Sequence, residues 1–231
     1  MKLMLIGGGE IGKGTTSYET KEIDEEIVKM TGKDNPNLLF VGLASSFSDS
    51  YYDVIKNIYK NLNCTPVYLK KNNLIHNPDL VKQKFIDADI IYIGGGDTVK
   101  LLEKIEEYNL KPLFDEALKR DTVLAGISAG AILLSKEGFS DAYILRGEKE
   151  NYEMIKGFNY FNNTITPHYH SDPKKTKELE EVLKKNKDIC FGIENGTALK
   201  IVNDKVEVIK SIKNNNVYKV SCKDKLIEEK I

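Results

Sequence analysis

A serine flanked by glycines is the most informative feature of the sequence. The segment Gly126-Ile127-Ser128-Ala129-Gly130 follows the apolar run Val123–Ala125 and precedes a stretch with a helical pattern, and it spells G-x-S-x-G. A serine on such a sharp strand-to-helix turn has a strained backbone, so the neighbouring positions must be small. We predict that Ser128 is a nucleophile that attacks a carbonyl carbon. Because the motif is short, a chance match is the alternative.

Attack by a serine produces a negatively charged oxygen, which needs hydrogen-bond donors. The helix that begins after Ser128 presents free amides, and the amide of Ala129 is one candidate donor. A second glycine-rich segment, Gly94-Gly95-Gly96-Asp97-Thr98, follows an apolar run and also precedes a helix. Glycine has no side chain that would block a ligand from the backbone amides, so we expect the amide of Gly95 or Gly96 to be the second donor. A sharp turn without a catalytic role is the alternative.

The serine also needs a base, and the chain has three histidines, His76, His168 and His170. His76 falls in the polar run 72–79, which has the pattern of a surface loop. His168 follows the strand-like segment Thr164–Thr166 and would lie at a strand end, where site residues gather. His168 is therefore a candidate base, and the residues alone leave His170 equally possible. His170 is the alternative base, or it forms a metal-binding pair with His168, but a His-x-His pair alone is weak evidence for a metal and we expect none.

A third group must orient the imidazole of the base and stabilise its charged form. Asp141 stands between Ser128 and His168 in the chain, which matches one known order of serine, acid and histidine. Glu148 and Glu150 are alternatives for this role. A loop residue or a helix cap is the other interpretation of Asp141.

A glycine-rich segment near the start of the chain nearly matches a phosphate-binding loop. The segment 7–14 reads GGGEIGKG, so glycine stands at position 14 where that loop requires a hydroxyl that binds magnesium. Thr15 and Thr16 follow in the wrong register. We therefore do not expect nucleotide hydrolysis. The segment is either a tight turn at the sheet edge or part of the lining of the site.

Short apolar runs alternate with segments of helical spacing through the first half of the chain. The candidate strands are Leu3–Ile6, Leu38–Leu43, Pro66–Leu69, Ile90–Ile93 and Val123–Ala125. Between them, apolar residues recur at helical spacing, as in Ile23, Ile27 and Met30. This alternation predicts an α/β three-layer sandwich, in which helices cover both faces of a mostly parallel sheet. Ligands bind such sheets at the carboxyl ends of the strands.

The last third of the chain has a different rhythm. One helical segment is expected there, at Lys174–Lys185. The strand-like runs around it are Thr164–Thr166, Cys190–Ile193, Thr197–Val202 and Val206–Ile209. Asn203-Asp204 and Asn214-Asn215-Asn216 have the composition of hairpin turns. We expect an antiparallel C-terminal extension of the same sheet, and a single domain over residues 1–231.

Composition narrows the function classes. With 34 Lys and Arg against 35 Asp and Glu, the net charge of −1 provides no basic field for nucleic acid or for anionic lipid. The three cysteines, Cys64, Cys190 and Cys222, have no spacing typical of a disulfide framework or a zinc site. The initial apolar run is too short for a signal peptide, and no stretch reaches the roughly 20 apolar residues of a membrane span. We expect a cytoplasmic protein that binds neither nucleic acid nor a membrane.

Four segments together resemble the peptidase E and cyanophycinase family, peptidase family S51. They are Ile91 to Thr98, Gly126 to Ala131, Ser140-Asp141 and Pro167-His168-Tyr169, and their order and separations also agree with the family. A fifth, Gly192-Ile193-Glu194-Asn195-Gly196-Thr197-Ala198-Leu199, is similar to the family's late G-I-D-E-x-T-A-L stretch. The resemblance implies a fold like that of the class I glutamine amidotransferases, which is flavodoxin-like.

The family resemblance also implies an activity. It is hydrolysis of a peptide or isopeptide bond after an aspartyl residue, by an acyl-enzyme route without a cofactor. The resemblance assigns Ser128 as nucleophile, His168 as base and Asp141 as the third group, while cyanophycinase-like members place a glutamate later, which keeps Glu148 and Glu150 open. The region 142–160 differs from the best-known aspartyl dipeptidases.

Three further residues are expected to contact substrate. Arg146, one of only two arginines, stands between the predicted acid and base and would bind a substrate carboxylate through a bidentate pair. Glu194 and Thr98 lie within the segments that resemble the family. A surface arginine is the alternative for Arg146. The oligomeric state stays open, with a homodimer as one alternative. Besides a serine peptidase, the hypotheses are an amidase or esterase with the same catalytic residues and a non-catalytic binding module of the same fold.

Overall fold

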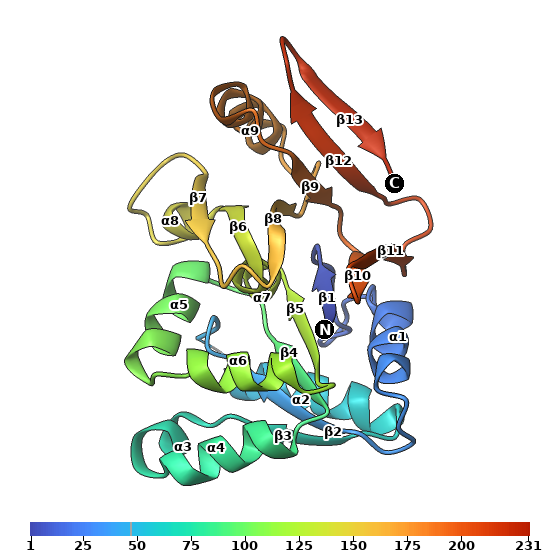
Figure 1. Ribbon diagram of the computed structural model, residues 1–231, viewed down its shortest axis with the longest axis vertical. Helices are drawn as coiled ribbons and strands as arrows, with labels where there is room; N and C mark the ends of the chain where they lie inside the picture. The colour runs from blue at the N-terminus through green and yellow to red at the C-terminus, as the bar shows by residue number, and fades with distance from the viewer. Residues whose placement is uncertain (47) are drawn as a thin grey trace.

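The computed structural model describes residues 1–46 and 48–231, and its largest sheet is mostly parallel. The strands of this sheet are β1 Lys2–Ile6, β2 Asn37–Val41, β3 Thr65–Tyr68, β4 Ile90–Ile93, β5 Val123–Ile127, β10 Thr197–Val202 and β11 Lys205–Lys210. They lie in the order β11-β10-β1-β5-β4-β2-β3 (Figure 1). The first five strands of the chain are parallel to one another, and β10 is antiparallel to both β1 and β11.

Helices cover both faces of this sheet, because alternate residues of each buried strand point to opposite sides. On one face, α1 Lys21–Thr31 and α2 Ser48–Asn61 pack on strand residues such as Met4 and Phe40. On the other face, α4 Pro78–Asp87, α5 Thr98–Glu107, α6 Lys111–Lys119 and α7 Ala129–Leu134 pack on residues such as Leu5 and Leu39. The short helix α3 Lys71–His76 precedes α4. The predicted α/β three-layer architecture is therefore confirmed.

A second sheet of six strands lies beside the first, at the top of the view in Figure 1. Its strands are β6 Ser135–Ser140, β7 Glu153–Lys156, β8 Phe161–Pro167, β9 Cys190–Ile193, β12 Val217–Cys222 and β13 Leu226–Lys230, and they lie in the order β13-β12-β9-β8-β6-β7. The helix α8 Ala142–Leu145 follows β6, and α9 Pro173–Asn186 packs on this sheet through Leu179 and Leu183.

The C-terminal strands divide between the two sheets. The expected antiparallel extension consists of β10 and β11, and the Asn203-Asp204 turn that joins them has positive φ at both residues (48° and 66°), as a tight hairpin requires. The segment Asn214-Asn215-Asn216 is not a hairpin turn, because it connects β11 of the first sheet to β12 of the second. An apolar pattern shows that a segment is a strand and does not show which strand it pairs with, so the second sheet was not foreseen.

The topology brings the chemistry-bearing segments of the sequence to neighbouring strand ends. The three glycine-rich segments follow β1, β4 and β5, which are adjacent parallel strands. In the second sheet, the parallel strands β8 and β9 end at Pro167 and Ile193, just before His168 and Glu194. In the described ranges, no helix is long and apolar enough to span a membrane.

Candidate active site

Ser128 occupies the strained turn that its motif predicts. It lies between β5 and α7 with φ 53° and ψ −109°, a conformation that is costly for any residue other than glycine. Its amide donates to the carbonyl of Ile6 (2.9 Å). A Cβ at Gly126 would lie 2.3 Å from the carbonyl carbon of Gly130, and a Cβ at Gly130 would lie 2.3 Å from the carbonyl oxygen of Ile93. Both glycines are therefore required by close packing of the backbone.

The structure brings His168 to Ser128. The imidazole Nε2 lies 2.9 Å from the serine Oγ. His168 follows β8 directly, its φ is 52°, and its amide donates to the carbonyl of Gly7 (2.8 Å). The strained backbone and this hydrogen bond turn the ring from the second sheet toward the end of β5. The two residues singled out in the sequence as nucleophile and base are thus in hydrogen-bond contact.

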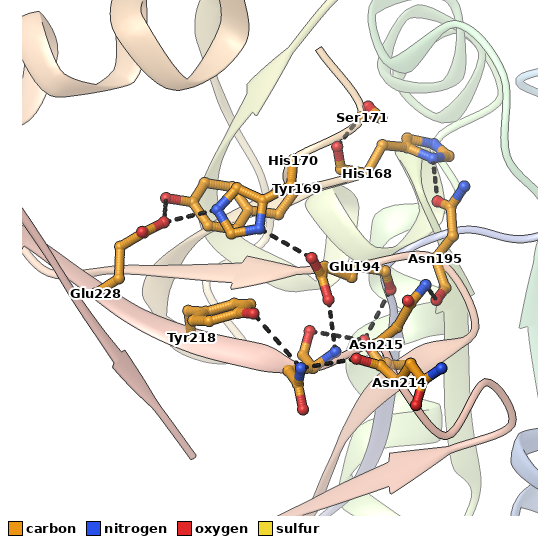
Figure 2. A network of polar contacts seen from close by, with 12 residues as sticks. His168, Tyr169, His170, Ser171, Glu194, Asn195, Asn214, Asn215, Tyr218 and Glu228 are labelled. Atoms are coloured by element: carbon orange, nitrogen blue, oxygen red, sulfur yellow. Dashed lines mark hydrogen bonds and ion pairs between the residues drawn. The ribbon is translucent and has the colours of Figure 1, made fainter. Parts of the chain in front are cut away.

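Asn195 holds the other side of the imidazole. Its Oδ1 lies 2.7 Å from His168 Nδ1, as the dashed line in Figure 2 shows. An amide oxygen only accepts, so Nδ1 is assigned as the protonated nitrogen, and Nε2 keeps the lone pair that can accept the serine hydroxyl proton. Asn195 is itself held by Asn215, whose Nδ2 donates to the Asn195 carbonyl (2.9 Å).

None of the three carboxylates expected to orient His168 contacts it. Asp141 stands at the start of α8, and among the described residues its carboxylate accepts no hydrogen bond, although its charge is near enough to raise the pKa of His168. Glu148 lies 3.7 Å from the Arg146 guanidinium, and both Glu148 and Glu150 are exposed. Asn195 fills the place expected for Asp141. A signal for it existed, because the glutamate of the family's G-I-D-E stretch aligns with this asparagine.

The electrostatic surroundings keep His168 neutral. Burial lowers its pKa, and the nearby charge of Lys175 lowers it further, while the Asn195 hydrogen bond and the charge of Asp141 oppose both effects. Lys175 is itself buried beneath this site, where its Nζ donates to the carbonyl of Pro167. Burial lowers the pKa of Lys175 to about 8. The imidazole is therefore in the form that can accept a proton near neutral pH.

The glycine segment after β1 lines the site. A Cβ at Gly8 would lie 2.2 Å from His168 Cε1 and 2.5 Å from Asn195 Oδ1, and Gly8 has φ 140°. Only glycine allows both the conformation and the close approach. Of the two interpretations offered by the sequence, the lining of the site is the one that the packing supports.

Two backbone amides, one directly after Ser128 and one in the loop after β4, have no acceptor in the described part of the chain. Among residues 1–46 and 48–231, the amides of Ala129 and Gly96 donate to no acceptor. The Gly95 amide lies 3.4 Å from the Tyr51 hydroxyl, a long contact, and a Cβ at Gly95 would lie 3.4 Å from the Cβ of Ser128. The loop after β4 therefore lies against the serine.

The side chains expected to bind substrate make intramolecular contacts instead. Arg146 donates from Nε to Asp97 (2.7 Å) and from Nη1 and Nη2 to the two oxygens of Glu103 (3.1 and 2.9 Å). Thr98 is buried, and its Oγ1 lies 3.1 Å from Ser140 Oγ. Arg146 therefore links the end of α8 to α5. The residues next to Arg146 in the chain gave no sign of this, because Asp97 and Glu103 come from a different segment.

The other two histidines lie away from Ser128. His76 ends α3 and is exposed, and the polar run 72–79, expected to be a loop, lies in α3 and the start of α4 except for Asn77 between them. His170 contacts Glu194 and Glu228 and not the serine. Within the described part of the chain, no group of three or more His, Cys, Asp or Glu side chains is placed to hold a metal ion.

Comparisons with known proteins agree on one family. The profile of peptidase family S51 matches residues 3–209. The peptidase YgaJ of Bacillus subtilis (strain 168), described as uncharacterized, is 28% identical over 99% of this chain and 96% of its own length. Peptidase E of Actinobacillus pleuropneumoniae serotype 5b is 25% identical over 90% of this chain and 89% of its own. The crystal structure of a peptidase from an acI-B1 actinobacterium has the same fold, with a TM-score of 0.74 and 22% identity over 100% of this chain and 93% of that one.

Proposed function

This chain belongs to peptidase family S51 and is a serine-type peptidase, and we propose that it cleaves small aspartyl peptides through an acyl-enzyme formed on Ser128. The observation that carries the proposal is the 2.9 Å contact between Ser128 Oγ and His168 Nε2 at a strained strand-to-helix turn. Nucleophile and base within hydrogen-bond reach, with the base oriented by a further group, are the signature of covalent catalysis by a hydroxyl.

The first step forms the acyl-enzyme. Ser128 Oγ attacks the carbonyl carbon of the scissile bond while its proton passes to His168 Nε2. The carbonyl oxygen gains the negative charge, and the amides of Ala129 and Gly96 stabilise it, with the Gly95 amide as a third donor when it leaves Tyr51. When the tetrahedral intermediate collapses, the C–N bond breaks and the proton on His168 passes to the leaving amine.

The second step releases the acid product. A water molecule gives a proton to His168 Nε2 and attacks the ester carbonyl carbon. When this intermediate collapses, the bond between the carbon and Ser128 Oγ breaks, and the proton on His168 passes to Oγ and restores the hydroxyl. In both steps Asn195 Oδ1 accepts from Nδ1–H and keeps the ring in the one tautomer that can act as a base. Asn195 is thus the positioning residue in this proposal, in place of the carboxylate predicted at Asp141.

Preference for an aspartyl residue is the part of the proposal that comes from the family resemblance. We do not propose Arg146 as the group that recognises that carboxylate, because two acids of the chain hold its guanidinium. Hydrolysis of matched dipeptides tests this preference directly.

A panel of α- and β-linked aspartyl dipeptides, with asparaginyl and alanyl dipeptides as matched controls, tests the proposal. We expect at least one aspartyl dipeptide to be cleaved with a kcat/KM at least about ten times that of its asparaginyl counterpart, since loss of a charged contact costs about 1.5 kcal/mol or more. Ser128→Ala should abolish every activity. Equal rates on the asparaginyl and aspartyl substrates would contradict the proposed aspartyl preference. Activity that survives in Ser128→Ala would contradict the proposed acyl-enzyme on Ser128.

A further inference from the structure

A second histidine beside the site lies between two carboxylates. His170 Nδ1 is 2.9 Å from Glu194 Oε1, and His170 Nε2 is 2.7 Å from Glu228 Oε1. The Tyr169 hydroxyl donates to the same oxygen of Glu228 (2.5 Å). Figure 2 shows the imidazole of His170 between the two acids, with Tyr218 below it. We call His170, Glu194 and Glu228 the carboxylate clamp.

The geometry of the clamp favours a charged imidazole. A neutral ring has one N–H, whereas an imidazolium donates from both nitrogens. Both nitrogens of His170 face carboxylate oxygens at hydrogen-bond distance, so the neutral ring would place a lone pair against one of the acids. The groups that face His170 are Glu194 from the end of β9, Glu228 from β13 and the rings of Tyr169 and Tyr218. Glu194 also accepts from the Asn216 amide (2.6 Å) and Glu228 from the Tyr169 hydroxyl, and among the described residues His170 is the group that links the two acids to each other.

The clamp connects the two loops that hold the catalytic imidazole. His170 is two residues after His168, and Glu194 directly precedes Asn195, so the pair of His170 and Glu194 joins the two segments at either end of the His168–Asn195 hydrogen bond. His168 and His170 both have positive φ (52° and 63°), which costs free energy unless surrounding contacts maintain it. A fixed separation of these loops is therefore a condition for the 2.7 Å contact between Nδ1 and Oδ1.

The other half of the clamp comes from the C-terminal hairpin of β12 and β13. Glu228 lies on β13, beyond the residues 3–209 that match the family profile. Its carboxylate binds Tyr169 and His170 together, and the Tyr169 ring lies against Gly192, where a Cβ would be 2.5 Å from the ring. Through Glu228, the hairpin thus holds Tyr169 and His170 next to β9.

We propose that protonated His170 is a positioning residue, whose ion pairs with Glu194 and Glu228 keep His168 aligned with Asn195 and Ser128, so that loss of its proton lowers activity at alkaline pH. The proposal rests on the proposed function of Ser128 and His168. It adds a role that the catalytic steps do not use, and it gives the C-terminal hairpin a function in the reaction.

The two histidines would then bound the active pH range from opposite sides. Burial disfavours the charged form of His170, but the hydrogen bonds and charges of Glu194 and Glu228 outweigh it and raise the pKa of His170. The pKa of His168 is lowered, as described above. Activity therefore rises with pH as His168 loses its proton and falls at higher pH as His170 loses its own.

Proton NMR and steady-state kinetics test this together. The chain has three histidines, so His76→Gln and His170→Gln assign the ring signals by elimination. In the wild type we expect the alkaline limb of kcat to coincide with the titration of His170, and the ring signals of His168 to shift in the same step. In His170→Gln the fall of kcat at alkaline pH should disappear. At pH values below that fall, kcat should be about ten-fold lower than in the wild type and KM changed less than two-fold, since one charged hydrogen bond is removed on each side of the ring.

Matched variants separate positioning from folding. Glu228→Gln weakens the clamp and should move the alkaline limb to lower pH, whereas Glu229→Gln, an exposed neighbour on β13, and His76→Gln should leave it in place. An alkaline fall of kcat that persists unchanged in folded His170→Gln overturns the proposal. A His168 ring signal whose chemical shift does not change as His170 titrates also overturns it. If the wild type shows no Ser128-dependent activity at all, the proposed function fails, and the NMR coupling between the two histidines still decides whether the clamp positions His168.

Discussion

The neutral amide of Asn195 is the feature of the site that a single substitution tests most sharply. Asn195→Asp keeps the size of the side chain and replaces the acceptor 2.7 Å from His168 Nδ1 with a carboxylate. The carboxylate favours the imidazolium, so the pKa of His168 rises, and the imidazole stays protonated to higher pH. The acid limb of kcat/KM, which reports the free enzyme's base, must then move upward.

The size of the effect follows from the contact. Two unit charges about 4 Å apart interact by about 4 kcal/mol at the effective dielectric constant of about 20 that suits protein sites. Part of this energy is offset by the cost of desolvating the new carboxylate. With about 1.4 kcal/mol for each pH unit, the acid limb should move upward by about 1 to 3 units. The plateau above the new limb should not fall, because the carboxylate also stabilises the imidazolium in the transition state.

The assay is a pH profile of kcat/KM for the best dipeptide, with the ring signals of His168 followed by NMR in the same buffers. Asn214→Asp is the matched control, because it adds the same charge at an exposed position beside the site. We expect the control to leave the acid limb within about 0.3 units of the wild type, as an exposed and screened charge does. An acid limb that does not move in Asn195→Asp would refute the view that Asn195 orients and tunes His168.

Three further substitutions and one control test the surroundings of the site. Lys175→Met removes the buried cation that lowers the pKa of His168, so the acid limb should move to higher pH, and an unmoved limb contradicts the stated cause. Gly8→Ala would place a Cβ 2.2 Å from the imidazole, so kcat should fall at least about 100-fold in a folded protein. Gly14→Ala, whose Cβ meets nothing within 4 Å, is its control and should keep full activity. Arg146→Lys should leave KM for an aspartyl dipeptide unchanged and lower stability by about 1 kcal/mol or less, measured by urea unfolding, and a raised KM would restore its role in substrate binding.

Much of the fold could be predicted because buried parallel strands are apolar throughout. The runs at β4, β9 and β10 coincide with the observed strands, and the helix predicted at Lys174–Lys185 is α9. Strand β6 was missed, since Ser135–Ser140 carries polar and charged residues and follows a helix of only six residues. Pairing between distant strands was beyond reach, because the choice between two sheets depends on contacts and not on the pattern within a segment.

The site was predictable to the extent that local geometry determines it. The elbow at Ser128 and the strand end before His168 are local features, and both were found. The group that contacts His168 Nδ1 is set by contact between two loops, so the sequence predicts Asp141 from its order in the chain and from the family pattern, whereas in the structure Asn195 makes this contact. Arg146 was singled out for its rarity, and its acidic partners could not be seen without the packing of α8 on α5.

Covalent labelling of Ser128 is the most direct measurement of the central claim. A fluorophosphonate probe, followed by intact mass and peptide mapping, should add one label per chain, on Ser128. The label should be absent from Ser128→Ala and form at least about 100-fold more slowly in His168→Ala, since activation of the hydroxyl requires the base. Labelling at another residue, or equal rates in the wild type and His168→Ala, would contradict the account.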